Sequence, residues 1–294
     1  MTRTERWLPW IYAFPTLVFV GLTFAYPMLS LLKSSIEHAG RSIYLPTRFV
    51  GLANFEFIFG DSLFIGAIGN NLKLFLCVPV LLILSVLLAQ LLHDRPRGWK
   101  VYRSLLFVPY ILSIPVVGVV FGYLFQYQGQ INSGLRALGL DALAADWLGN
   151  STFAMPTIMA VIVWKELGFG IILCLARLSS VGDQYFEAAR VDGANWFQIL
   201  RHVTVPQLSP TLAFYAMVEM INMLSWVFSY IFVMTRGGPQ NSTVVAEFYI
   251  YQQVFQNSQI GVGAAASLVL LALVGVLLAG RQWLERRLDH YAAD

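Results

Sequence analysis

The sequence is poor in charged residues. Of its 294 residues, 12% are Asp, Glu, Lys or Arg, and 57% are apolar. Soluble domains carry about 25% charged residues, so this composition excludes an ordinary soluble fold and indicates a polytopic membrane protein. The long apolar runs also lack the polar–apolar alternation of membrane β-barrel strands. A net charge of +3 is too small to indicate a nucleic-acid partner.

Groups that serve catalysis are scarce as well. The two cysteines, Cys77 and Cys174, each lie inside an apolar run, and we interpret them as small membrane-helix residues rather than disulfide or metal ligands. The phosphate-binding pattern Gly-x-x-x-x-Gly-Lys-Ser/Thr is absent, and the chain contains no Gly-Lys dipeptide. We find no convincing Ser/His/Asp or metal-ligand constellation. We therefore expect no enzyme, no ATPase site and no cofactor in this chain.

The sequence does contain a series of charge-free runs. Because about 20 apolar residues cross a bilayer, these runs predict an all-α integral membrane protein with six transmembrane helices, near 9–32, 68–92, 104–126, 152–176, 210–234 and 259–280. The first run is longer than the ~7–15-residue core of a cleaved signal sequence, so we expect it to be retained. We divide the chain into a first helix with its outer loop (1–67), a core transmembrane domain (68–280) and a tail (281–294).

The Lys and Arg residues between the runs predict the orientation, because cytoplasmic segments are enriched in them. With the N-terminus inside, the inner segments hold Arg3, Arg6, Arg95, Arg97, Lys100, Arg103, Arg177, Arg190, Arg201, Arg281, Arg286 and Arg287. The outer segments hold Arg41, Arg48, Arg136 and Arg236, whereas Lys33, Lys73 and Lys165 lie in or beside the predicted spans. Both termini are therefore predicted to be cytoplasmic, with inner loops at 93–103 and 177–209.

The second inner loop is long for a simple connection and has a helical pattern of its own. Phe186–Asn195 can form a short helix, with Asp183 as its N-cap. Gly193 can break that helix or adopt a positive φ. A second short helix would start at Trp196 and end at Val205-Pro206, before Pro210 and the fifth span. We expect a compact helix–turn–helix at about 183–206, lying on the inner membrane face.

The segment from Glu187 to Pro206 reads EAARVDGANWFQILRHVTVP. It resembles the EAA loop of permease subunits of binding-protein-dependent ABC importers: Glu-Ala-Ala, three residues, Gly, nine residues, then Ile-x-Leu-Pro. Val203 and Val205 replace Ile and Leu, and the Asp192-Gly193-Ala194 triplet has the common form. The resemblance implies that the loop inserts into a cleft of an ATPase. Glu187 would meet a basic group, Ala188 and Ala189 would pack in the cleft, and Gly193 would form the turn.

Other stretches are similar to the carbohydrate-uptake branch of this family, over about residues 49–280. They are Phe49–Phe55, Arg103–Pro109 with Pro115, Trp164–Phe169, and the outer turn with Thr235, Gly237, Gly238 and Pro239. The outer turn could contact a partner or be only a turn. The resemblance implies the type I ABC importer transmembrane fold in a bacterial inner membrane. It also implies three kinds of partner: a second homologous permease, two ATPase subunits that bind ATP and Mg, and an extracytoplasmic solute-binding protein.

A stripe of polar and aromatic residues follows the predicted fifth helix. Glu219, Asn222, Trp226 and Tyr230 are spaced to share one face, and an ionisable group within a span usually faces a cavity or a partner. Sugars need hydroxyl-bonding groups and flat aromatic faces, so the stripe could line a sugar pathway, or instead seal a helix–helix contact. Trp164, Lys165 and Glu166 could line the same cavity, or Lys165 and Glu166 could pair with a neighbouring subunit.

These observations together predict the permease subunit of an ATP-driven importer. The resemblance suggests an oligosaccharide, a sugar alcohol or glycerol-3-phosphate as solute. An ion-coupled secondary transporter is the alternative, because Glu219 and Lys165 lie within spans, although no inverted repeat is visible. An intramembrane enzyme is a further alternative, against which stands the missing catalytic constellation.

Overall fold

The computed structural model describes residues 8–38 and 47–293. Arg3, Arg6 and Arg41, which contribute to the predicted orientation, lie outside these ranges. The chain divides into two compact units, Met1–Ile65 with Tyr249–Asp294, and Gly66–Phe248. Each unit is described by itself.

The first unit combines both ends of the chain. Its elements are α1 (Leu8–Val20), a π-helical turn (Gly21–Ala25), α2 (Tyr26–Ser35), β1 (Glu37–His38), β2 (Arg48–Phe49), α3 (Ala53–Gly60), a second π-helical turn (Gln252–Gln256) and α15 (Ile260–Ala293). The two strands pair antiparallel, with Glu37 opposite Phe49. Helices α2 and α3 both pack against α15.

Asn54 joins the parts of the first unit. Its side-chain nitrogen donates to the carbonyl oxygens of Ser35, at 2.8 Å, and Glu37, at 3.1 Å. Asn54 is buried, so these bonds form away from water and fix α3 against the end of α2. The asparagine of the 49–55 motif therefore has a structural role in this fold.

The second unit contains the remaining helices. They are α5 (Cys77–His93), α6 (Trp99–Ile111), α7 (Ile114–Leu124), α8 (Gln130–Ala137), a 3₁₀ turn (Asp141–Leu143), α9 (Ser151–Ser180), α10 (Asp183–Val191), α11 (Trp196–Ile199), a π-helical turn (Leu200–Thr204), α12 (Val205–Ser225) and α13 (Phe228–Met234). Helices α4 (Ser62–Leu74) and α14 (Ala246–Tyr251) cross the boundary between the units.

Helix α9 is the centre of the second unit, with α5, α6 and α12 packed against it. A glycine permits the close approach of α6. A Cβ at Gly168 would lie 2.6 Å from the carbonyl oxygen of Leu106, which is closer than any side chain allows. Small residues at helix contacts have this role in membrane proteins, where close backbone packing holds helices together.

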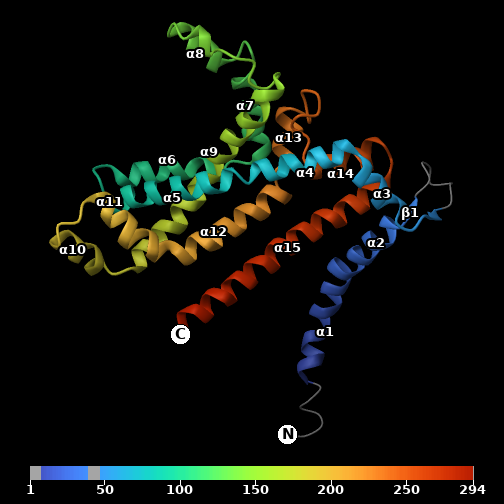
Figure 1. The fold of residues 1–294 in the computed structure, drawn as a ribbon, viewed down its shortest axis with the longest axis horizontal. Coiled ribbons are helices and arrows are strands. Elements are labelled where there is room, and N and C mark those ends of the chain that lie inside the picture. Colours follow the sequence, from blue (N-terminus) through green and yellow to red (C-terminus); the bar gives the residue numbers. More distant parts are fainter. Residues whose placement is uncertain (1–7, 39–46, 294) are drawn as a thin grey trace. The chain divides into compact units, whose positions relative to one another are not determined.

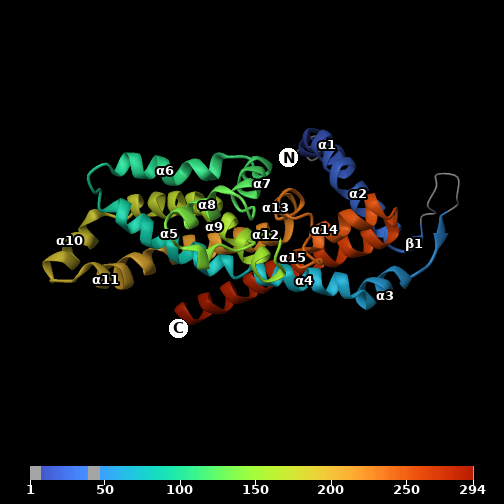
Figure 2. The same cartoon turned by 90° about the horizontal axis from the view of Figure 1, so that it is seen from above.

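The short helices of the second unit lie at separate ends of it (Figures 1 and 2). Helices α10 and α11 lie beside the C-terminal end of α5, and α8 extends from the far end of α7. The predicted inner loop at 183–206 and the predicted outer loop at 127–151 are therefore well separated.

Among the described residues, four helices are long and apolar enough to cross a membrane: Tyr12–Ser35, Ser62–His93, Ser151–Ser180 and Ile260–Arg281. Two bent pairs also pass as pairs, α6 with α7 at an angle of 99°, and Trp196–Ser225 with α13 at 48°. The number of spans is six if each bent pair is one span.

Two details of the sequence prediction are wrong. The predicted third span, 104–126, is not one straight helix, because α6 ends at Ile111 and α7 begins at Ile114. The predicted second short helix is not separate either, because α11 continues through the π-helical turn into α12. The wider turn just before Pro206 changes the hydrogen-bond register, and this lets the helix continue past a residue without an N–H.

Candidate functional site

The 183–206 loop folds as one helix, a tight turn and the start of a longer helix. The N–H groups of Asp192 and Gly193 donate to the carbonyls of Ala188 and Arg190, at 2.9 and 3.1 Å, and end α10. Gly193 has a φ of +78°, and a Cβ there would meet nothing within 4 Å. A glycine is therefore required by the backbone angle rather than by lack of space.

Asn195 starts the next helix through a capping box. Its side-chain oxygen accepts from the N–H of Gln198 at 2.9 Å, and the Gln198 side chain accepts from the N–H of Asn195 at 2.7 Å. This arrangement satisfies two N–H groups that a helix start leaves unpaired. The predicted cap at Asp183 is wrong, because α10 begins at that residue and Gly182 is its N-cap.

The loop has an exposed face and a buried face. Glu187, Ala188, Asp192 and Pro206 are exposed, as are the apolar side chains of Val191 (86%) and Phe197 (62%). On the opposite face Phe186 is buried in a cluster that includes Leu178, Ile199 and Leu208, and Ala189 packs against this cluster. Of the two predicted small contact residues, Ala188 is exposed and Ala189 is half-buried.

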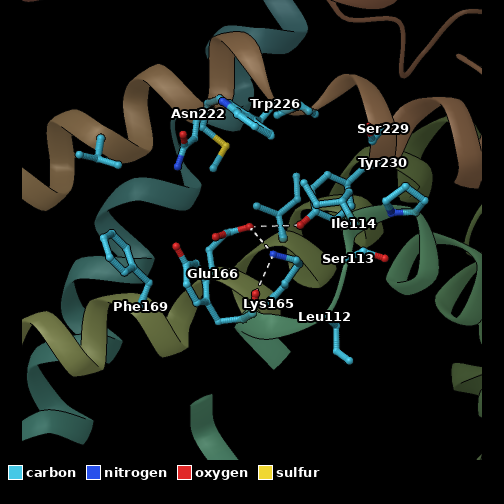
Figure 3. A pocket seen from close by; sticks show the side chains of 16 residues that line it. Leu112, Ser113, Ile114, Lys165, Glu166, Phe169, Asn222, Trp226, Ser229 and Tyr230 are labelled. Atoms are coloured by element: carbon cyan, nitrogen blue, oxygen red, sulfur yellow. Dashed lines mark hydrogen bonds and ion pairs between the residues drawn. The ribbon is translucent and has the colours of Figure 1, made fainter. Parts of the chain in front are cut away.

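A second feature is a cavity of about 670 Å³, named the α9 cavity here, whose wall comes from α6, α7, α9, α12 and α13 (Figure 3). Its wall residues are Tyr110, Leu112, Ser113, Ile114, Pro115, Ile162, Lys165, Glu166, Phe169, Val218, Asn222, Met223, Trp226, Val227, Ser229 and Tyr230. The breaks of both bent helix pairs are in this wall, through Leu112 and Ser113 in one pair and Trp226 and Val227 in the other. Irregular backbone within a membrane is tolerated where it lines a cavity or is buried in protein.

The charges in the cavity wall are paired. Lys165 Nζ lies 3.1 Å from Glu166 Oε1 and donates to the carbonyl oxygen of Tyr110 at 3.4 Å. Tyr230 donates its hydroxyl to the same Glu166 oxygen at 3.3 Å (Figure 3). Both charged residues are buried, and a buried ion pair persists when such additional hydrogen bonds satisfy it. Besides this pair and Tyr230, the polar side chains of the wall are those of Tyr110, Ser113, Asn222, Trp226 and Ser229.

The predicted pathway residues are only partly brought together. Lys165, Asn222, Trp226 and Tyr230 line the α9 cavity, whereas Glu219 and Trp164 do not. The prediction that the stripe follows one helix face is wrong, because α12 ends at Ser225 and α13 starts at Phe228 after a bend of 48°.

Glu219 and Trp164 have other surroundings. Glu219 is fully buried, and its carboxylate interacts with the side chain of Asn222, three residues further along the same helix. Trp164 packs its ring edge-on against Phe121, with centroids 4.9 Å apart.

The outer turn is held by its own hydrogen bonds. The hydroxyls of Thr235 and Thr243 lie 2.8 Å apart, and Thr243 donates to the carbonyl of Gly238 at 2.8 Å. Gly237 has a φ of +83°, and Pro239 follows in the same turn. Asn70 of α4 donates to the carbonyls of Ser242 and Val244, at 3.0 and 2.8 Å. These bonds explain the motif residues as parts of one rigid turn.

Residues 72–290 match the family described as "Binding-protein-dependent transport system inner membrane component". The chain belongs to this family. A probable ABC transporter permease protein of Pyrococcus horikoshii is 31% identical and aligns over 92% of this chain and 94% of its own length. The lactose transport system permease protein LacF of Rhizobium radiobacter is 28% identical, over 91% and 90%.

A solved structure has the same fold. It is the crystal structure of a bacterial alginate ABC transporter in complex with an alginate pentasaccharide-bound periplasmic protein. One of its chains superposes with a TM-score of 0.82 at 25% identity, covering 97% of this chain and 96% of that chain. This protein is therefore an ABC transporter permease by family and has the type I permease fold.

Sequence reasoning missed several residues of the permease's α9 cavity. Tyr110, Ser113 and Ser229 line it, but none belongs to the predicted stripe. The signal for the first two was present, because Pro109 and Pro115 flank the break between α6 and α7. Proline ends a helix or occupies its first turn, so a pair six residues apart within one apolar run indicates a broken span.

Proposed function

We propose that this permease carries a carbohydrate-type solute through the membrane, powered by a separate ATPase that docks on the 183–206 loop. One observation carries the proposal: the loop with the Glu-Ala-Ala spacing is folded around Gly193 and exposes Glu187, Ala188 and Val191. A structured loop with exposed apolar side chains is typical of a surface that another protein covers.

The residues of the loop have distinct roles in this proposal. Glu187 pairs with a basic group of the ATPase, and Ala188 lets the partner approach the helix backbone. Asp192 and Gly193 end α10 and set the turn, Ala189 anchors the helix on its own core, and Pro206 lies where the loop joins α12. ATP and Mg are bound by two ATPase subunits, and this chain contributes no ATPase site.

We further propose that each bent pair is one span, which gives six spans with both termini in the cytoplasm of a bacterial inner-membrane protein. A second, homologous permease completes the pathway as a heterodimer. An external solute-binding protein delivers solute to the outer side, where Gln240, directly after the 235–239 turn, is exposed. The alginate transporter, solved with its periplasmic protein, supports the role of the solute-binding protein.

The chemistry of the α9 cavity wall favours a solute without net charge. Its charged wall residues are Lys165 and Glu166, which offset each other. Phosphate recognition needs an uncompensated cation or a cluster of N–H donors. Instead, the exposed ring of Trp226 offers a flat face, and Ser113, Asn222 and Ser229 offer partners for hydroxyls. A neutral oligosaccharide or a sugar alcohol therefore fits this wall better than glycerol-3-phosphate. The relatives are named for both kinds of solute, because LacF is a lactose permease and UgpA of Escherichia coli O157:H7, 30% identical, is an sn-glycerol-3-phosphate permease. The choice therefore rests on the cavity wall.

The test is transport by the purified complex in proteoliposomes. The permease is expressed with its partner permease, ATPase and binding protein, and uptake of labelled lactose, mannitol and glycerol-3-phosphate is measured with and without ATP. We expect ATP-dependent uptake of one of the neutral solutes, unaffected by ionophores. Uptake that needs an ion gradient and no ATP would overturn the proposal in favour of secondary transport. ATP-driven uptake of glycerol-3-phosphate alone would overturn the choice of solute but not the transport mechanism.

A further inference from the structure

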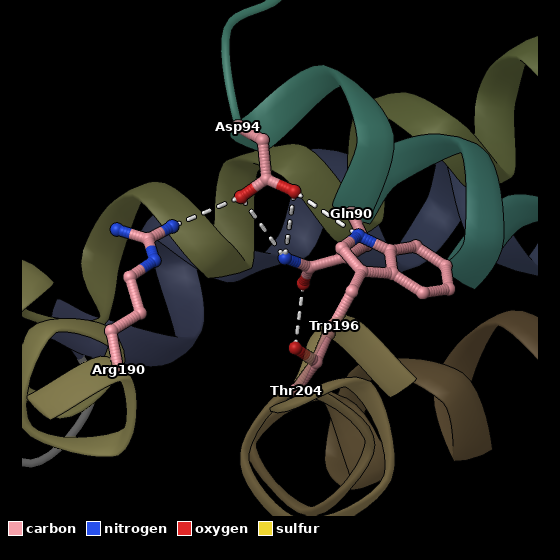
Figure 4. A network of polar contacts seen from close by, with 5 residues as sticks. All are labelled: Gln90, Asp94, Arg190, Trp196 and Thr204. Atoms are coloured by element: carbon pink, nitrogen blue, oxygen red, sulfur yellow. Dashed lines mark hydrogen bonds and ion pairs between the residues drawn. The ribbon is translucent and has the colours of Figure 1, made fainter. Parts of the chain in front are cut away.

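The end of α5 touches both sides of the turn in the 183–206 loop. Asp94 follows α5 directly, and its N–H donates to the carbonyl of Gln90 at 3.2 Å. One carboxylate oxygen of Asp94 lies 3.2 Å from the guanidinium of Arg190, on α10. The other accepts from the indole Nε1 of Trp196, on α11, also at 3.2 Å (Figure 4). A single carboxylate thus joins the two helices that flank Gly193 to a third helix.

The contact continues into the interior of the second unit. Gln90 lies one turn back along α5, and its amide nitrogen faces Asp94 at 3.4 and 3.5 Å. Its amide oxygen accepts from the hydroxyl of Thr204 at 2.6 Å (Figure 4). Gln90 and Thr204 are both buried. Their bond is therefore shielded from water and holds the start of α12 in a fixed register on α5.

The surroundings of Asp94 place it next to the proposed docking face. Asp94, Glu187 and Arg190 line one small cavity of about 190 Å³. His93 and Phe186 line the same cavity, and the centroid of the His93 ring lies 4.8 Å from that of the buried Phe186 ring. Apolar packing of Phe186 thus attaches α10 to the unit without help from Asp94. The polar contacts of Asp94 fix the orientation of α10 and α11 on α5, because hydrogen bonds depend on angle and apolar contacts do not.

We propose that Asp94 is a positioning residue that transmits movement of the 183–206 loop to the α9 cavity. The path runs from Arg190 and Trp196 through Asp94 to α5, and α5 packs along α9, which carries Lys165 and Glu166. Without Asp94 the loop can tilt on its apolar base while α5 stays in place. This inference rests on the proposed function, because the ATPase must supply the movement.

The experiment measures movement at the cavity separately from ATP hydrolysis. In the purified complex, Trp226→Cys places a thiol in the cavity wall, where 65% of the native side chain is exposed. The native cysteines Cys77 and Cys174 are buried and do not compete for a membrane-impermeant maleimide. The ratio of labelling with ATP to labelling without ATP then reports whether the cavity responds.

Four changes are compared in this background. D94N removes the ion pair and keeps the side-chain size, whereas R190Q removes the same ion pair with a shorter side chain. The double variant combines both substitutions, and W196F removes the indole donor and keeps an aromatic ring. Arg97→Gln is the matched control. It removes a charge from the 93–103 loop, which also contains Asp94, but Arg97 makes none of the contacts described above. Arg190 and Trp196 are 53% and 38% exposed, so substituting them should not prevent folding. R190Q and W196F therefore test the inference if D94N does not assemble.

We expect D94N and R190Q each to reduce the ATP-dependent labelling change roughly two- to fivefold, the range for a partly exposed ion pair. The double variant should be no worse than D94N alone, because partners in one interaction are not additive. W196F should reduce the change in the same direction, and the Arg97→Gln control should stay at the background level. Because Arg190 and Trp196 belong to the proposed docking loop, labelling is compared per copurified ATPase. D94N should keep ATPase copurification and ATP hydrolysis at the background level.

Three results would overturn the inference: an unchanged labelling ratio in the variants, reductions that multiply in the double variant, or a loss that merely follows loss of bound ATPase. Failure of the proposed function is a different result. In that case the background protein with native Asp94 binds no ATPase, or its labelling does not respond to ATP.

Discussion

Gly193 allows the sharpest test of the proposed docking loop. Its φ of +78° lies in the left-handed region, and a methyl group added at its Cα would meet no atom within 4 Å. The cost of Gly193→Ala is therefore the backbone cost alone, about 1–2 kcal/mol. That cost lowers the population of the native turn by a factor of roughly 5 to 30 relative to competing turns. The turn is exposed, and the penalty stays local because Phe186 and Ile199 keep the flanking helices packed.

Three substitutions separate backbone strain from steric obstruction. Gly193→Asn adds a side chain that tolerates the left-handed region, Gly193→Ala adds strain with little volume, and Gly193→Glu adds strain, bulk and charge at the docking face. We expect ATP-driven uptake to fall in the order Gly, Asn, Ala, Glu, with Glu close to inactive. Membrane insertion and yield should stay near wild type for all three.

The assay is uptake and stimulated ATP hydrolysis in proteoliposomes, with copurified ATPase as a control for docking. If Ala is as active as wild type, the turn geometry does not matter to coupling. If Asn is as poor as Glu, the effect is steric, and the argument from φ is wrong. Wild-type uptake and stimulated ATPase activity in Gly193→Glu would remove the loop from the mechanism altogether.

Other predictions concern the cavity, the orientation and one buried carboxyl. Trp226→Ala should raise the solute concentration needed for half-maximal uptake while leaving complex assembly intact, and unchanged uptake and specificity would count against the cavity. Reporter fusions in the 93–103 and 127–151 loops should read inside and outside respectively, and the reverse result would refute the topology. Burial raises the pKa of Glu247, which lies outside the spans, so the neutral form stabilises the fold at low pH and this contribution is lost as pH rises through the raised pKa. Glu247→Gln should therefore melt increasingly above wild type as pH increases, and an equal difference at all pH values would contradict this.

The linear motifs of this sequence predicted helix ends and turns well, because these features depend on local backbone geometry. The spacing from Glu187 to Gly193 placed the end of α10 within a few residues, since a helix end and a positive φ depend on neighbouring residues alone. Asn195 and Gln198 could have been recognised in the same way, as an N-cap and its partner three residues later. The apolar runs likewise placed the long helices, which need only length and composition.

The composition of the cavity could not be predicted in this way. Assigning Glu219 and Tyr230 to one face assumes an unbroken helix. Because the helix bends at Trp226, the helical periodicity no longer predicts which face the residues after Trp226 occupy. Glu219 faces a buried site, which the spacing cannot distinguish from a cavity wall. Tyr110 and Ser113 come from another span, and their approach to Lys165 depends on packing around Gly168, a contact between distant segments that no local pattern encodes.

The two bent helix pairs connect these observations. Helix breaks release N–H and carbonyl groups that lipid cannot satisfy, so the breaks must face protein or water. The break residues of α6–α7 and of α12–α13 line the same α9 cavity, although more than a hundred positions separate Ser113 from Trp226 in the sequence. A tightly packed helix bundle would have no reason to bring two breaks together. A path that solute must enter and leave does, because short helix segments on either side of a break can tilt without unpacking the long helices, α5 and α9, behind them.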